Sequence, residues 1–266
     1  MFEKKNRILL KELVKTDFKL RYQGSVIGYL WSVLKPIMLF AVMYIVFIYF
    51  LRFGDDVPHF AVALLLGQVL WGFFNETTNL GMVSIVNRGD LLRKLNFPTY
   101  IIVVSVSINA FINLMISLVI VFIFGLINQV DLSVFGFLAP LLFIELYAFS
   151  LGIAFILATI YVRFRDIGPI WEVLLQIGLY MTPIIYPVTL IIERADIRIA
   201  KILLLNPMAQ MIQDMRYWFT SPVNVTVWQL IDNKFIMLIP YVIPFIVLIV
   251  GFLVFNKNSK KFAEIL

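Results

Sequence analysis

The chain has 266 residues, of which 62% are hydrophobic and only 14% charged, and its mean hydropathy is +0.95. Because a soluble domain carries roughly 25% charged residues, this composition excludes a soluble protein and indicates an integral membrane protein. The absence of cysteine excludes disulfides, thiolate metal sites and a cysteine nucleophile, and the single histidine, His59, excludes a multi-histidine metal site.

Residues 1–24 form a basic segment with helical periodicity. At about 100° per residue, its lysines gather on one arc and its leucines on the opposite arc. Asp17 and Arg21 interrupt the apolar arc, but they stand four residues apart and can pair with each other. The pattern predicts a helix lying in the cytoplasmic interface of the membrane. This helix is either a generic anchor or an element with a mechanical role.

Six apolar runs follow, each near the length that crosses a hydrocarbon core of about 30 Å as a helix. They cover residues 27–51, 60–85, 101–126, 134–162, 170–192 and 235–255. Helices are predicted because a lipid-exposed backbone must satisfy its own hydrogen bonds, and these runs lack the alternation of barrel strands. The whole chain, 1–266, is therefore predicted to be one all-α transmembrane domain.

Basic residues orient this predicted bundle. With the N-terminus inside, sixteen of the 22 Lys and Arg residues fall in inner segments and six in outer segments. Positive charge marks the cytoplasmic side, so both termini are predicted to be cytoplasmic. The net charge of +6 is assigned to loops that face anionic lipid, and nucleic acid is not an expected partner.

A charged island at residues 87–98 separates the second and third spans. Its charged residues are Arg88, Asp90, Arg93 and Lys94. Gly89 and Asp90 can begin a short helix, and Phe97-Pro98 ends it, because the residue before a proline leaves helical space. Three leucines then have no core of their own to enter, namely Leu91, Leu92 and Leu95. The island is either a docking element for a cytoplasmic partner or a helical turn on the lipid headgroups.

The outer segment at residues 193–234 is too apolar for a solvated loop. Residues 197–205 can form one short helix. Asn206 and Pro207 provide a capping residue followed by proline at the first helical position, which opens a second helix to about residue 219. These helices either dip into the membrane surface, shielded by protein, or form an amphipathic hairpin on it.

Two of the predicted spans carry polar ridges. The ridge of the second span includes Asn75, Glu76 and Asn79, and that of the third includes Ser105, Asn109, Asn113 and Ser117. Such ridges usually face the bundle and form hydrogen bonds between helices. Glu76 and Glu145 differ, because a charge near mid-membrane costs a few kcal/mol or more. Each must be protonated, paired or exposed to a wet cavity.

Aromatic residues make up 15% of the chain. Phe40, Tyr44 and Phe47 share one face of the first span, where they either pack against lipid or a helix or offer a stacking surface for sugar rings. No catalytic residue or metal site is predicted, since the sequence has no phosphate-binding glycine loop, paired metal-ligand spacing or Ser-His-Asp set. Energy for any work must come from a gradient or from a partner.

Five motifs give the chain a familiar appearance. They are Asp17-x3-Arg21-Tyr22-x2-Ser25-x2-Gly28-x2-Trp31-x4-Pro36, Arg93-Lys94-x2-Phe97-Pro98, Arg165-Asp166-Ile167, Thr182-Pro183-Ile184-Ile185-Tyr186-Pro187 and Asn206-Pro207-Met208. In this order they resemble permease subunits of type-2 ABC exporters. The most similar group is that of the polysaccharide and teichoic-acid exporters, which includes the Wzm-like O-antigen permeases.

The resemblance implies a homodimer of six-span permeases in the bacterial cytoplasmic (inner) membrane, bound to two copies of a separate ATPase subunit. ATP and Mg would bind to that partner, and this chain would hold no cofactor. The exported material would be a lipid-linked glycan, which moves through a channel lined partly by aromatic residues. The channel-lining candidates are Phe40, Tyr44, Phe47, Asn75, Glu76 and Asn79.

The resemblance also assigns roles to the connecting segments. Residues 87–98 would be the coupling helix that enters the ATPase, and its docking residues would be Arg88, Asp90, Leu91, Leu92, Arg93, Lys94, Leu95 and Phe97. The interfacial helix would contribute Asp17, Arg21 and Tyr22. The outer helices would be re-entrant gate helices, with Tyr186, Pro187, Asn206, Pro207 and Arg216 at the gate.

Other functions remain open from the residues alone. A teichoic-acid permease, or a type-2 permease for small lipids or drugs, would share these features. A membrane-embedded glycan transferase would need acidic or histidine residues clustered at one membrane face, whereas the acidic residues here are scattered. A structural scaffold would leave Glu76 and Glu145 unexplained.

Overall fold

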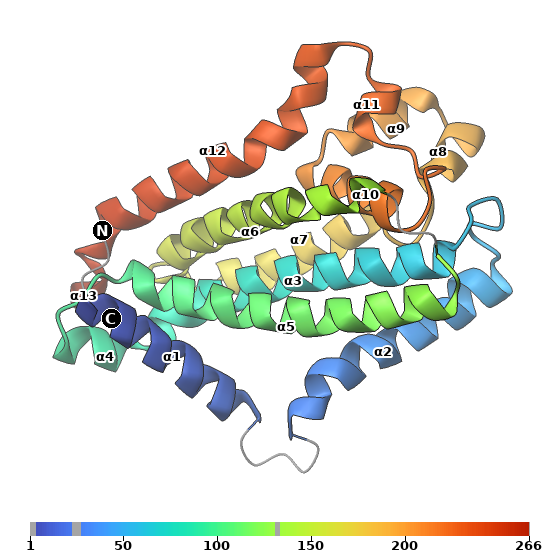
Figure 1. Ribbon diagram of the computed structural model, residues 1–266. Coiled ribbons are helices and arrows are strands. Elements are labelled where there is room, and N and C mark those ends of the chain that lie inside the picture. Colours follow the sequence, from blue (N-terminus) through green and yellow to red (C-terminus); the bar gives the residue numbers. More distant parts are fainter. Residues whose placement is uncertain (1–3, 23–27, 131–133, 266) are drawn as a thin grey trace.

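The computed structural model describes residues 4–22, 28–130 and 134–265. The ends of the predicted interfacial helix at 1–3 and 23–24, the start of the first span at residue 27, and Ser25 lie outside these residues, as does the side chain of Tyr22. Within the described ranges every regular element is a helix (Figure 1), which confirms the predicted all-α fold.

Five helical segments are long and apolar enough to cross a membrane. The first, Trp31–Phe50, joins α2 (Trp31–Met43) to the π-helical segment η2 (Tyr44–Phe50). The others are α3 (Phe60–Asn87), α5 (Tyr100–Ile127), α6 (Ala139–Tyr161) with a short 3₁₀ segment, η3 (Val134–Leu138), before it, and α12 (Lys234–Ser259). These segments match five of the six predicted spans.

The fifth predicted span, residues 170–192, is not one continuous helix. It is divided into α7 (Ile167–Met181) and α8 (Val188–Arg194), and residues 182–187 between them are not helical. Pro183 forces Thr182 into an extended conformation with ψ 132°, because a residue before proline avoids helical space. At 1.5 Å per residue, α7 alone is about 22 Å long, which is shorter than a membrane core of about 30 Å.

Helix α3 lies at the centre of the bundle. The helices α5, α6, α7, α2 and the outer helix α10 (Pro207–Phe219) all pack on it, so its side chains are buried almost all round. By contrast α2 and η2 contain no buried residue, and α7 buries only Gly168 and Leu175. The first span and α7 therefore present uncovered apolar faces.

Helices α6 and α12 approach each other closely through a pair of glycines. A Cβ added to Gly152 would collide with the backbone of Leu248, and one added to Gly251 would collide with the backbone of Gly152. Small residues at such crossings allow two membrane helices to pack backbone against backbone. This contact fixes the otherwise poorly buried α12 to the bundle.

One end of the bundle carries α8, α9 (Ile197–Leu204), α10 and α11 (Val227–Leu230). Helices α9 and α10 confirm the two predicted at 197–205 and 207–219, whereas α8 and α11 were not predicted. Ten consecutive residues of α10, Pro207 to Arg216, are buried. Helix α10 is thus an internal element of the bundle and not a hairpin on its surface.

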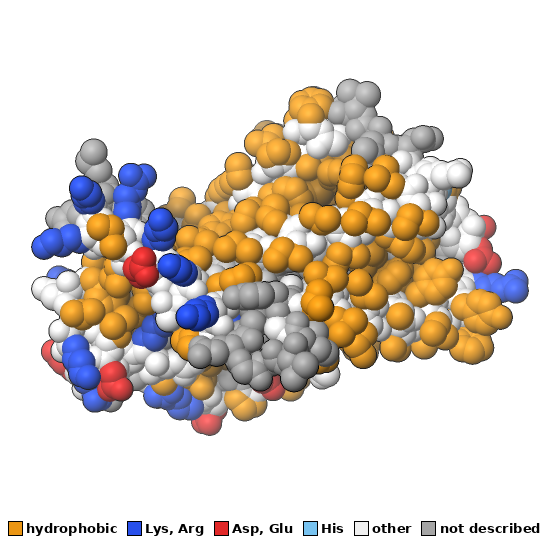
Figure 2. Space-filling model, turned by 60° about the horizontal axis from the view of Figure 1, so that its bottom comes forward, with side chains coloured by type: hydrophobic (Ala, Val, Ile, Leu, Met, Phe, Trp, Pro, Cys, Tyr) orange, Lys and Arg blue, Asp and Glu red, His pale blue; other side chains and the backbone are white. Residues whose placement is uncertain are grey.

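The opposite end carries α1 (Lys4–Tyr22), α4 (Gly89–Lys94) and α13 (Phe262–Ile265), with both described ends of the chain (Figure 1). Figure 2 shows that Lys and Arg side chains gather at this end, beside a broad apolar surface over the rest of the molecule. We refer to it as the basic end, and to the end that carries α8 to α11 as the outer end.

The charge distribution predicts that the basic end is cytoplasmic. Because the native chain has no cysteine, single introduced cysteines can be labelled by a membrane-impermeant reagent without background. We expect His59→Cys, at the outer end of α3, to be labelled from outside intact cells, and Asp90→Cys only after the membrane is permeabilised. Labelling of Asp90→Cys in intact cells would show that the predicted orientation in the membrane is wrong.

Candidate coupling site

Helix α4 is a separate short helix because the chain breaks on either side of it. Arg88 leaves helical geometry at φ −122°, which ends α3, and Leu95 is extended at φ −126° and ψ 134°. The acidic Asp90 lies in its first turn, and Arg93 and Lys94 lie in its last turn, as the helix dipole favours. The short helix predicted within 87–98 is therefore confirmed, and its bounds are residues 89–94.

The leucines of α4 are not equivalent, and the expectation that none of them has a core is wrong for Leu92. Leu92 and Phe97 pack against an apolar cluster that includes Phe255 of α12 and Phe262 of α13. Helices α3, α5 and α6 supply most of this core together with the C-terminal segment, and the helical pattern of residues 87–98 could not reveal it. Leu91 is partly buried, whereas Leu95 is 50% exposed.

The exposed side of α4 borders an open cleft. This cleft has a volume of about 500 Å³ and lies between residues 92–100 and the end of α12 at Asn256, Ser259 and Lys260. Arg93 and Lys94 are exposed at its edge beside Leu95. A helix held by apolar contacts on one side, with leucine and basic side chains exposed on the other, offers a surface for a protein partner.

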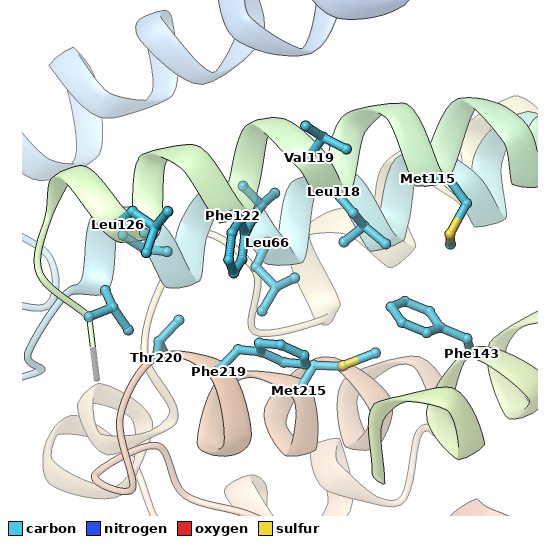
Figure 3. Close-up of a pocket in the computed structure, with 14 residues that line it drawn as sticks. Leu66, Met115, Leu118, Val119, Phe122, Leu126, Phe143, Met215, Phe219 and Thr220 are labelled. Atoms are coloured by element: carbon cyan, nitrogen blue, oxygen red, sulfur yellow. The ribbon is translucent and has the colours of Figure 1, made fainter. Parts of the chain in front are cut away.

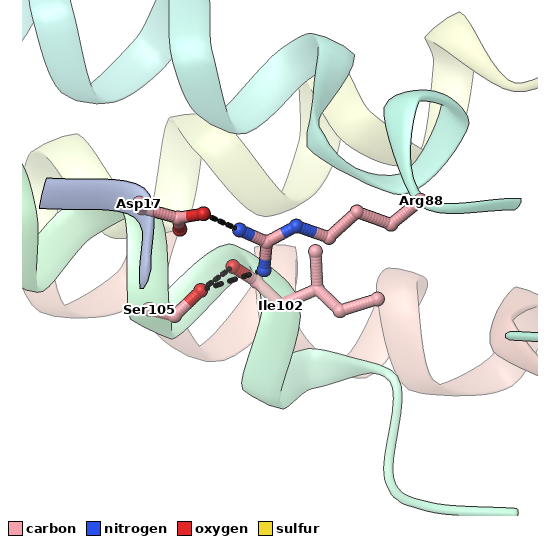
Figure 4. Close-up of polar contacts among 4 residues, drawn as sticks. All are labelled: Asp17, Arg88, Ile102 and Ser105. Atoms are coloured by element: carbon pink, nitrogen blue, oxygen red, sulfur yellow. Dashed lines mark hydrogen bonds and ion pairs between the residues drawn. The ribbon is translucent and has the colours of Figure 1, made fainter. Parts of the chain in front are cut away.

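Arg88 joins the start of α4 to α1. Its guanidinium forms an ion pair with Asp17 of α1 and donates a hydrogen bond of 3.2 Å to Ser105 Oγ of α5 (Figure 4). Ser105 in turn donates to the carbonyl of Ile102. Arg88 stands between α3 and α4, so one side chain links the second span, the third span, α1 and the start of α4.

A second ion pair lies further along α3, near the middle of that helix. Arg21, in the last turn of α1, pairs with Glu76 of α3, and Glu76 also accepts a hydrogen bond of 2.8 Å from Asn113 Nδ2 of α5. The charge of Glu76 is thus compensated. The sequence allowed Asp17 and Arg21 to pair with each other, but in the structure Asp17 pairs with Arg88 and Arg21 pairs with Glu76. Helix α1 is fixed to the bundle through two charged side chains four residues apart.

The remaining channel-lining candidates of α3 lie beside Glu76. Asn79 Nδ2 donates to Asn75 Oδ1 at 2.7 Å, so these two side chains satisfy each other along the helix. On the first span, Phe40 and Phe47 turn towards the core, and the ring of Phe40 lies 5.2 Å from that of Phe124. Tyr44 is 40% exposed. The role of all six candidates in a channel stays a prediction.

The residues assigned to the outer gate gather around the break after α7. Asn206 caps α10 by accepting from the backbone of Met208 at 3.0 Å, and Pro207 is the first helical residue, as the sequence predicts. Asn206 also donates to Thr182 at 3.4 Å. The hydroxyl of Tyr186 donates to the carbonyl of Tyr180 at 2.7 Å, and Pro187 precedes α8.

Arg216 forms three hydrogen bonds in this region. Its side chain is fully buried and donates to the carbonyls of Ala63 at 2.9 Å, Pro183 at 2.6 Å and Ile184 at 2.6 Å. The sequence placed Arg216 among the outer charges, but it lies inside the protein and satisfies backbone carbonyls that the break after α7 leaves open. It joins α10, α3 and residues 183–184.

An apolar cavity of about 320 Å³ lies beside α10. Phe122 and Leu118 of α5 point across it towards Met215 and Phe219 of α10, and Phe143 of α6 forms one end (Figure 3). Apart from Thr220, its side chains are apolar or glycine. The hydroxyl of Thr220 already donates to the carbonyl of Arg216 and accepts from Asn224, so the lining suits a hydrocarbon chain better than a sugar.

Sequence reasoning missed several exposed aromatic residues. Tyr49 and Phe50 of η2 are each 71% exposed, and Tyr180 of α7 is 63% exposed. They lie on the first span and α7, which have the least burial of the apolar helices. Their positions in the sequence could not indicate this exposure, because it depends on how the helices pack against one another.

These features define a class of protein, namely an all-helical, multi-pass membrane protein with a short, partly exposed helix at one end and an internal helix at the other. The chain belongs to the ABC-2 type transporter family, whose model matches residues 8–220. Two O-antigen export system permease proteins RfbA from Klebsiella pneumoniae are 31% and 30% identical to it, each over 97% of this chain and 95% of the relative. A third, from Myxococcus xanthus, is 31% identical over 77% of both chains.

The Arg21–Glu76 pair should stabilise the attachment of α1. Both side chains are partly buried, with exposures of 36% and 22%, so the pair lies between a surface pair and a buried one. We expect Glu76→Gln to lower the free energy of unfolding by about 2 kcal/mol. The measurement is a double-mutant cycle with Arg21→Gln in detergent. Glu12→Gln on the exposed face of α1 is the control. Additive effects of the two substitutions would contradict the pairing.

Proposed function

We propose that the chain is the membrane permease subunit of an ATP-driven exporter that carries a lipid-linked polysaccharide, of the O-antigen kind, across the bacterial cytoplasmic membrane. One observation carries this proposal: relatives named as O-antigen export permeases match 97% of the chain and 95% of their own length. The family match over residues 8–220 supports the wider class. These relatives favour a polysaccharide over a small lipid or a drug.

Energy would enter through a separate ATPase subunit, which would bind ATP and Mg. Helix α4 fits the contact, since Leu92 and Phe97 hold it to the permease while Leu95, Arg93 and Lys94 face outward. A push on α4 would act directly on Arg88, and through Arg88 on α1 and α5. The ion pairs thus provide a route by which docking movements reach the membrane helices.

A second copy of the chain would cover the uncovered apolar faces of the first span and α7. Neither α2 nor η2 buries a residue within one copy, and α7 buries two. Tyr44, Tyr49 and Tyr180 are exposed on these helices. A channel between two copies would then be lined partly by aromatic rings, which contact sugar faces without fixing one orientation.

The export function can be tested in the bacterium that carries the chain. Its deletion should remove the surface polysaccharide while the lipid-linked polymer accumulates inside the cell, and a wild-type copy should restore export. Replacing Phe40, Tyr44 and Phe47 by leucine should leave membrane insertion intact and reduce export severalfold. Phe245→Leu, at an exposed site on α12, is the control. A normal surface polysaccharide after deletion would refute the proposed function.

The docking contact can be tested on the purified permease and ATPase. Leu95 is half exposed, so Leu95→Asp should leave the permease folded and weaken ATPase binding at least about tenfold, because the burial of one leucine contributes about 1.5–3 kcal/mol. Lys94→Ala should change binding little, since an exposed charge contributes about 1 kcal/mol or less. Unchanged stoichiometric binding by Leu95→Asp would place the contact elsewhere.

A further inference from the structure

Two acidic side chains are buried between α6 and α10, away from the coupling site. Glu145 of α6 is 5% exposed and Asp214 of α10 is 1% exposed. Gln210 of α10, which interacts with both carboxyls, is fully buried. The ion pairs of the basic end and the hydrogen bonds of Arg216 account for none of these three side chains.

Donors to this cluster converge on one atom. Asp214 Oδ2 accepts hydrogen bonds from the hydroxyl of Tyr241 on α12 at 2.6 Å and from Gln210 Nε2 at 2.8 Å. Helices α6 and α10 pack together here, which brings Glu145 within hydrogen-bonding reach of Gln210 and within electrostatic reach of Asp214. Three buried oxygens of this cluster find no hydrogen-bond partner among the described residues, and they are Glu145 Oε1, Gln210 Oε1 and Asp214 Oδ1. The cluster therefore has more acceptors than donors.

Neighbouring helices do not supply the missing positive charge. Arg216, two residues after Asp214, donates to three backbone carbonyls on the side of α3 and residues 183–184. On α3, Glu76 is paired with Arg21, and on α6 the hydroxyl of Tyr147 bonds to Ser107.

The helix α9 also packs on α10, and its basic residues are Arg198, which is exposed, and Lys201, which is partly buried. The segment η3 carries no titratable residue. Among the described residues, the titratable groups that act on the two carboxyls are each other and Tyr241.

Two adjacent carboxylates in such surroundings cannot both be ionised, because each desolvated charge raises the cost of the other. One bound proton removes one of the two charges and adds a hydrogen-bond donor to the cluster. If Glu145 binds it, its hydroxyl becomes the donor that Gln210 Oε1 lacks, and Asp214 remains the anion that Tyr241 and Gln210 stabilise. The reverse assignment would place the proton on the carboxyl that already has two donors.

We propose that Glu145 is a proton-binding site, and that its bound proton holds the outer helix α10 against the fourth span. The proton works as a clasp through a chain of hydrogen bonds from Glu145 to Gln210 and Asp214, and on to Tyr241 of α12. Separation of α10 from α6 would admit water, and Glu145 would then ionise in neutral medium. The clasp depends on the geometry of α6, α10 and α12, and not on which substrate is exported.

Infrared spectroscopy of the purified permease in lipid nanodiscs tests the proton directly, because protonated and ionised carboxyls have separate C=O bands. At neutral pH we expect a protonated band in the wild type that disappears in Glu145→Gln and persists in Asp214→Asn. Glu172→Gln, an exposed acid on α7, is the matched control and should leave the band in place. A wild type without the band, or a band lost only in Asp214→Asn, would overturn the proposal.

The pH dependence of the melting temperature gives a second readout. A carboxyl that is neutral in the folded protein and ionised in the unfolded chain stabilises the fold less as pH rises. The melting temperature of the wild type and of Glu172→Gln should therefore fall from mildly acidic to mildly alkaline buffer, and that of Glu145→Gln should fall less. Equal slopes of melting temperature against pH in the wild type and Glu145→Gln would overturn the proposal. A wild-type slope that disappears when sodium or calcium is added would show that the site binds a metal cation and not a proton, and it would also overturn the proposal.

Discussion

The broken fifth span is the constraint on which the outer half of this protein depends. Inside a membrane, backbone carbonyls freed by a helix break must find donors within the protein. The break at residues 182–187 frees the carbonyls of Pro183 and Ile184, and Arg216 donates to both of them. Arg216 reaches them only because α10 enters the bundle. The short α7, the buried α10 and the fully buried arginine therefore require one another.

Charged side chains towards the basic end must also find partners within the protein, and here the partners are other charged side chains. Glu76 and Arg88 stand on or beside the central α3, and each finds its partner on α1. A helix that merely rests on lipid headgroups has no need to direct Asp17 and Arg21 inward. These two pairs, with Ser105 and Asn113 of α5 as further partners, make α1 an attached part of the bundle.

Much of this architecture could be predicted from the sequence, and the failures have physical causes. Hydropathy located five spans and proline chemistry located the start of α10, because both signals are local. The break at Pro183 was missed because the flanking residues are apolar on both sides, so the hydropathy stays high through it. The core under Leu92 and the partners of Asp17, Arg21 and Arg216 were missed because they depend on contacts between residues far apart in the chain.

Helix α3 joins the two ends mechanically. Its 28 residues span about 42 Å as a straight helix, it ends at Arg88 beside α4, and near its start the carbonyl of Ala63 accepts from Arg216. Gly67, one turn further on, lies against the Arg216 side chain, and a Cβ there would displace it. A rigid helix with a polar contact at each end transmits a displacement along its axis without needing a deformable core. A movement that α4 receives from a partner would thus reach α10, which carries Asp214 and packs against the helix of Glu145.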